Sequence, residues 1–132
     1  MEYKKGYKDN AFIVKMELVA FAGSDKENWG QIKGLINHGE WDKIIIVKNR
    51  DSGDFNEERC DIVEINSNEK IIELKKDIME KLKNKISGEL EVSLSLASGN
   101  GKEHMALISA LLSIPVGIRL VVFTKNGIEY IN

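Results

Sequence analysis

Short apolar runs rich in β-branched residues alternate along this sequence with longer segments whose apolar residues recur every three to four positions. The short runs are typical of buried strands, and the periodic segments are typical of amphipathic helices. Ser24-Asp25 and residues 67–69 are expected to cap the first two helices. Strands are expected at residues 13–22, 43–47, 61–65, 90–96, 118–123 and 128–131, and helices at residues 29–36, 71–86 and 105–112.

The expected order of elements is β-α-β-β-α-β-α-β-β, which favours parallel strands joined by right-handed crossovers. Asn126-Gly127 predicts a tight hairpin turn between the last two strands. The predicted fold class is therefore α/β, a Rossmann-like three-layer sandwich with a mostly parallel sheet and a C-terminal antiparallel hairpin. The 132 residues are expected to form a single domain, with residues 1–10 as a flexible N-terminus.

Composition narrows the classes of function and the compartment. The formal charge of −2 argues against broad binding to duplex nucleic acid, which requires a basic surface. A single cysteine, Cys60, excludes an internal disulfide and is typical of a reducing compartment. One cysteine and two separated histidines also argue against a zinc site. No apolar run approaches the length of a membrane span, and no signal peptide is recognised, so we expect a cytoplasmic protein.

The sequence Ser-Gly-Asn-Gly-Lys at residues 98–102 lies between an expected strand and an expected helix. A glycine loop at this position directs backbone N–H groups and a helix N-terminus at one point, which suits a phosphate or another anion. The loop is not a P-loop, because Glu103 follows Lys102 and Leu96 stands where the first glycine belongs. The alternative interpretation is a plain tight turn with a solvated lysine.

Ligands of open α/β sheets bind beyond the carboxyl ends of the strands, where the winding of the chain reverses. The loop after the first strand and the loop after residues 90–96 are expected to meet at such a point. Lys102 is then the charged ligand contact, and His104 is either an acid–base group or a surface cap. The expected ligand-binding residues are Gly23, Ser24, Asn28, Ser98, Gly99, Asn100, Gly101 and Lys102.

These two loops and the terminal hairpin resemble the CRISPR-associated Rossmann-fold (CARF) family of antiviral defence proteins. The matching segments are residues 22–25, 97–105 and 117–131. The resemblance implies a homodimer that binds one cyclic oligoadenylate across its two-fold axis. It also implies, as an alternative, a ring nuclease that cleaves this ligand without metal or cofactor. For the nuclease, the resemblance implies Lys102 and His104 as catalytic residues, with Ser24 or Ser98 orienting the attacking ribose hydroxyl.

Three functions therefore remain open from the sequence. The first is a dimeric sensor of a cyclic oligoadenylate or a similar anionic nucleotide, and the second is the ring nuclease. The third is an assembly module in which the Gly99–Gly101 turn is only structural. The sequence identifies neither the ligand and its ring size, nor turnover, nor the oligomeric state, nor whether another chain carries an effector.

Overall fold

The computed structural model describes residues 16–87 and 91–132, which form one six-stranded sheet in the order β3-β2-β1-β4-β5-β6. All neighbouring strands are parallel except β5 and β6, which form the antiparallel hairpin. The predicted fold class and order of elements are confirmed. The strands are β1 (Glu17–Ala22), β2 (Lys43–Asn49), β3 (Cys60–Ile65), β4 (Glu91–Ser95), β5 (Gly117–Thr124) and β6 (Gly127–Tyr130). The helices are the 3-10 turn η1 (Lys26–Asn28), α1 (Trp29–His38), α2 (Ile71–Leu82) and α3 (Gly101–Ser113).

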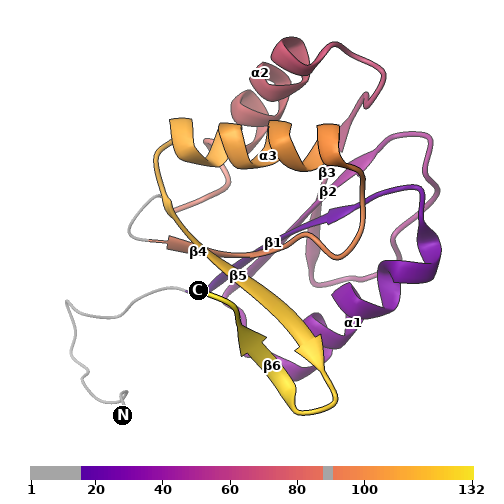
Figure 1. Ribbon diagram of the computed structural model, residues 1–132, viewed down its shortest axis with the longest axis vertical. Helices are drawn as coiled ribbons and strands as arrows, with labels where there is room; N and C mark the ends of the chain where they lie inside the picture. The colour runs from indigo at the N-terminus through magenta and orange to yellow at the C-terminus, as the bar shows by residue number, and fades with distance from the viewer. Residues whose placement is uncertain (1–15, 88–90) are drawn as a thin grey trace.

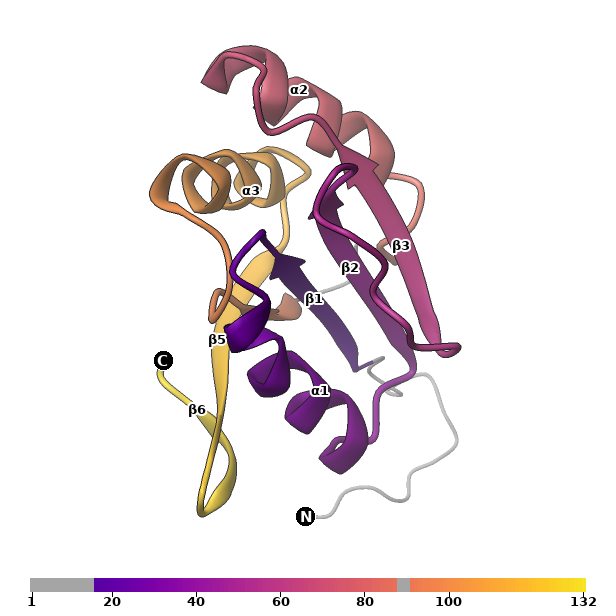
Figure 2. The ribbon, with the colours of Figure 1, turned by 90° about the vertical axis from the view of Figure 1, so that its right-hand side faces the viewer.

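The helices lie on both faces of the sheet, with α2 and α3 on one side and α1 on the other (Figures 1 and 2). Every residue of β1 is buried, and the side chains from Leu18 to Ala22 alternate between the two apolar cores. Val19 and Phe21 pack under α2 and α3, whereas Leu18, Ala20 and Ala22 pack under α1. A central parallel strand is buried in this way because crossover helices cover both of its faces.

The segment between β2 and β3 differs from the expected solvated loop. Asp51 and Asp54 are exposed, but Phe55 is 95% buried and its ring centroid lies 5.3 Å from that of Trp29. Parallel neighbours need a connection that passes over one face of the sheet. This connection contains no helix, so Phe55 fills the space beside α1 that a crossover helix would otherwise occupy.

Several expected boundaries also shift. Residues 1–10, the expected start of the first strand at residues 13–15 and the expected helix stop at Gly88 lie outside the described residues. Helix α2 begins after Lys70 without a side-chain cap and ends at Leu82, so the expected cap at residues 67–69 and the expected end at Ile86 are wrong. The side chain of Ser67 is bonded elsewhere, as described below. Within residues 16–87 and 91–132, no helix is long and apolar enough to cross a bilayer.

Helix α1 packs closely on β5 because Gly34 has no side chain. A Cβ atom added at Gly34 would lie 2.4 Å from the ring of Phe123. Ser93 and Ser95 of β4 are also buried on the face of the sheet opposite Val92 and Leu94, and the hydroxyl of Ser93 lies 3.1 Å from that of Tyr130 on β6. The absence of a side chain at Gly34 therefore sets the distance between α1 and β5.

The substitution Gly34→Ala should lower the free energy of unfolding by about 1–3 kcal/mol, because the ring of Phe123 has to move. Gly30 of α1 is the matched control, since a Cβ atom there meets nothing within 4 Å. Gly30→Ala should raise stability by up to about 1 kcal/mol through helix propensity alone. Urea denaturation measures both, and equal effects of the two substitutions would contradict the close packing.

Candidate functional site

The winding of the chain reverses at β1, since β2 and β3 lie on one side of it and β4 to β6 on the other. The loops that follow β1 and β4, residues 23–28 and 96–100, leave the carboxyl ends of these paired parallel strands. Such a reversal is where open α/β sheets bind ligands. The structure therefore brings together the two loops that the sequence predicted to meet.

The two loops are in direct contact. The N–H of Gly23 donates to the hydroxyl oxygen of Ser98 at 2.8 Å, and Ser98 is fully buried. A Cβ atom on Gly23 would lie 2.6 Å from the Cα of Gly99. Gly99 has a φ of 107°, a conformation that favours glycine. At this point the loops touch through backbone atoms.

The carboxylate of Asp25 accepts hydrogen bonds from three residues that the sequence predicted to bind a ligand. Its Oδ1 accepts the hydroxyl of Ser98 at 2.6 Å and the N–H of Gly99 at 3.0 Å. Its Oδ2 accepts the side-chain amide of Asn28 at 2.8 Å. Burial alone would raise the pKa of Asp25, but the hydrogen bonds from Ser98, Asn28 and Gly99 hold it below the ordinary value of 3.8. The structure places Asp25 at the N-cap position of η1, as the sequence predicted, but its side chain makes no capping hydrogen bond because this carboxylate binds the opposite loop.

The N-terminus of α3 is capped by its own residues. The side chain of Asn100 accepts the N–H of Glu103 at 2.9 Å, and Oε1 of Glu103 accepts the N–H of Asn100 at 2.8 Å. This reciprocal pair is a capping box. The first two N–H groups of the helix, those of Gly101 and Lys102, have no partner within a helix. Gly101 is exposed, and a Cβ atom added to it would meet nothing within 4 Å.

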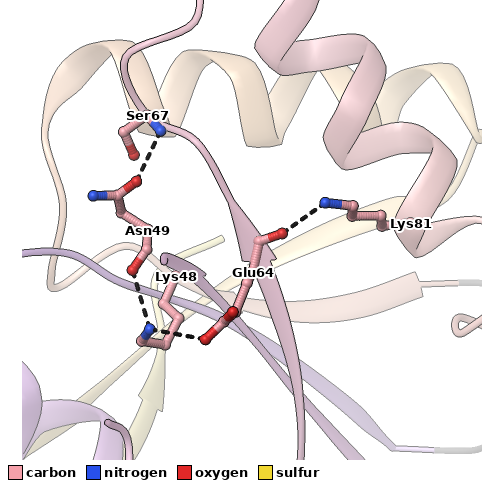
Figure 3. Close-up of polar contacts among 5 residues, drawn as sticks. All are labelled: Lys48, Asn49, Glu64, Ser67 and Lys81. Carbon is pink, nitrogen blue, oxygen red and sulfur yellow. Dashed lines mark hydrogen bonds and ion pairs between the residues drawn. The ribbon is translucent and has the colours of Figure 1, made fainter. Parts of the chain in front are cut away.

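Ser67, which follows β3, connects this cap to the carboxyl ends of β2 and β3. We call this end of the sheet, with the loops that follow β1 to β4, the rim. Its hydroxyl donates to Oε2 of Glu103 at 2.5 Å, and its carbonyl accepts the ammonium of Lys102 at 2.8 Å. Its N–H donates to the side chain of Asn49 at 2.9 Å (Figure 3). Lys102 thus reaches from α3 to the loop after β3, and Glu103 is 95% buried between the two.

Lys48 is a buried lysine at the carboxyl end of β2, with 2% of its surface exposed. Its ammonium donates to the carbonyl of Asn49 at 3.0 Å and lies 3.4 Å from a carboxylate oxygen of Glu64 on β3 (Figure 3). Sequence reasoning missed both residues. The available signal was a lysine that directly extends an apolar strand of a parallel sheet, a position that is buried on both faces.

His104 lies under the glycine loop. Its Nε2 is 2.7 Å from the carbonyl oxygen of Ser98, so this nitrogen carries the proton and donates it. The ring meets that of Phe21 edge-on at 6.3 Å between centroids. His104 therefore stabilises the glycine loop. The two residues that the resemblance implied as catalytic, Lys102 and His104, each donate to a backbone carbonyl.

The assembled site offers few groups for chemistry. Asp25 and Glu103 are satisfied carboxylates, Ser24 and Asn28 are exposed at its edge, and Ser98 is buried in hydrogen bonds. In the part of the chain that the structure describes, no three His, Cys, Asp or Glu side chains gather to hold a metal ion. The groups available to a ligand are the backbone N–H groups of the first turn of α3 and the exposed ammonium of Lys102.

Comparison with known proteins adds no further constraint on this site. No protein-family model matches the sequence. No curated protein is significantly similar to it.

The charge of Asp25 should contribute to stability in a pH-dependent way. Because folding lowers its pKa, this contribution is complete above pH 3.8 and is lost as the pH falls through the lower pKa of the folded protein. Asp25→Asn keeps the shape and one acceptor oxygen. At pH 7 it should lower the free energy of unfolding by up to about 1 kcal/mol, since solvent screens a partly exposed carboxylate.

Urea denaturation at a series of pH values measures this difference, which should vanish in acid. Asp51→Asn is the control, because Asp51 is exposed on the neighbouring loop. A gap between wild type and Asp25→Asn that stays constant down to the acid limit would contradict the role of the charge.

Proposed function

We propose that this protein binds an anionic nucleotide, a cyclic oligoadenylate or a close chemical relative, at the rim where the loops after β1 and β4 meet. The observation that carries the proposal is the open N-terminus of α3 beside that junction. Gly101 is exposed there, and Lys102 lies next to it on the same turn. Backbone N–H groups at a helix N-terminus, with a lysine beside them, are suited to a phosphate.

The phosphate is proposed to lie on the N–H groups of Gly101 and Lys102 and not on those of the glycine turn itself. Gly99 already donates to Asp25, and Asn100 already donates to Glu103. The ammonium of Lys102 is exposed and bonded only to the Ser67 carbonyl among the described residues, so it can turn toward a phosphate. This exchange replaces a hydrogen bond to a neutral carbonyl by a stronger one to an anion.

A ligand in this position also faces Asp25, whose carboxylate repels a bare anion. A nucleotide overcomes this because it carries hydroxyl and amino donors beside its phosphates. Asn28, next to Asp25 and exposed, can pair with the same polar groups. The proposed ligand is thus a nucleotide with free donors, and a simple phosphate is expected to bind weakly.

A homodimer is part of the proposal. Helix α3 exposes Met105 and Leu112, seven residues apart on one side, with 63% and 61% of their surfaces accessible. Large exposed apolar side chains in a row are typical of an interaction surface. If two copies pair through α3, two Lys102 side chains act on one ligand. The same surface would serve the assembly module that the sequence also left open. The half-buried thiol of Cys60, whose pKa is raised to about 11 chiefly by burial, suits the proposed cytoplasmic location.

Binding is favoured over ring cleavage by the contacts of the two tentative catalytic residues. His104 holds the Ser98 carbonyl from beneath the loop, and Lys102 holds the Ser67 carbonyl. Metal-independent cleavage needs groups that align a ribose hydroxyl with its phosphate and stabilise the developing charge. No contact of the described residues favours that alignment, so the sensor is the function proposed.

Titration calorimetry with cyclic tetra-adenylate and cyclic hexa-adenylate tests the binding proposal. Wild type should bind one of them, and Lys102→Ala should bind it about tenfold more weakly, because a charge-assisted contact is lost. Lys125→Ala, in the exposed turn of the β5–β6 hairpin, should bind as wild type does. Absence of heat with both rings, or equal loss in the two variants, would count against the proposal.

Incubation of the same ligand with excess protein, followed by chromatography, separates sensor from nuclease. The ring should remain intact in the presence and absence of a chelator. Linear products that form with wild type but not with His104→Ala would contradict the sensor and identify the protein as a ring nuclease.

A further inference from the structure

Strand β3 forms an edge of the sheet, and among the described residues no strand pairs with its outer side. The carbonyl of Ile65 accepts the N–H of Arg50 at 2.9 Å and therefore points inward, toward β2. Successive residues of a strand direct their N–H and C=O groups to opposite sides. Ile62 and Glu64 consequently direct theirs outward, away from the sheet. An unpaired row of this kind is a template for another strand.

One of these outward groups is already occupied. The ammonium of Lys81, on α2, donates to the carbonyl oxygen of Glu64 at 2.7 Å (Figure 3). Asp77, one turn earlier on α2, holds that ammonium at 3.2 Å. Lys81 lies over a groove of about 410 Å³ between α2 and β3, lined by Ile62, Val63, Glu64, Lys81 and Lys85.

Glu64 is held from its other end as well, because its carboxylate lies 3.4 Å from the buried ammonium of Lys48. Beside it Ile62 exposes 36% of its surface, an apolar side chain on an open edge. Such an edge favours pairing unless a charge interrupts it. The ammonium of Lys81 on the outward carbonyl of Glu64 is that interruption.

We propose that Lys81 guards the edge of β3 and prevents it from pairing with β3 of a second copy of this chain. The second copy is the fitting occupant because antiparallel pairing about Val63 sets Ile62 of each copy opposite Glu64 of the other. No like charges then stand directly opposite in the two outward-facing pairs. This inference does not depend on the proposed ligand or on the surface of α3.

The substitution Lys81→Met tests this role of Lys81, since methionine has a similar length and an apolar stem but no hydrogen-bond donor. Self-association should strengthen on the order of tenfold, the change expected for loss of one hydrogen bond from a charged group. Light scattering across a concentration series measures it, and the amides of Ile62 and Glu64 should exchange more slowly with deuterium. Lys83→Met, which changes a lysine that directly follows α2 and pairs with Glu80 on that helix, should behave as wild type.

A second substitution identifies the surface through which the Lys81→Met variant associates. In Lys81→Met, adding Ile62→Glu sets two carboxylates opposite each other and should restore the association of wild type. Two results would overturn the proposal. One is Lys81→Met with the mass and amide exchange of wild type at every concentration. The other is association that Ile62→Glu does not reverse, which would place the new contact on another surface.

Discussion

Burial of β1 on both faces is the constraint on which the rest of this structure depends. Its six residues are all buried, and the five from Leu18 to Ala22 alternate between two apolar cores. Both cores must be covered, so helices lie on the two faces of the sheet. Because β1 is central, the remaining strands extend from it in both directions, and the winding of the chain has to reverse beside it. The junction of the loops after β1 and β4 is a direct consequence of this burial.

At that junction the protein satisfies many of its own donors. The carboxylates of Asp25 and Glu103 accept from Ser98, Gly99, Asn100 and Ser67. Internal acceptors rigidify the glycine loop, since buried polar groups are costly without partners. They also limit where a ligand can act, namely at the exposed first turn of α3. A ligand that brings donors as well as phosphates matches this surface better than a simple anion does.

Three lysines share one structural role near the rim and the adjoining sheet edge. Lys48, Lys81 and Lys102 each donate to a backbone carbonyl, those of Asn49, Glu64 and Ser67. These carbonyls lie in or just after β2 and β3, where the sheet ends. Ammonium groups therefore replace the missing neighbouring strand or helix as donors, and the rim is tied to α2 and α3. In the sequence, nothing distinguishes these lysines from the other charged residues of a chain whose formal net charge is −2.

The element order and the mostly parallel sheet with its terminal hairpin could be predicted from the sequence, because periodicity and turn residues act locally. The meeting of the two loops was expected from the usual place of ligand sites in such sheets, and it required β1 and β4 to be neighbours, which the structure shows. The pairing of the polar groups, in contrast, depends on contacts that form only in the folded chain. Asp25 bonds Gly99 across 74 positions and Ser67 bonds Glu103 across 36. A local pattern predicts that such residues cap the nearest helix, because contacts between distant segments leave no periodic signal in the sequence. Phe55 and Lys48 illustrate the same limit: their burial depends on what the folded chain places over them.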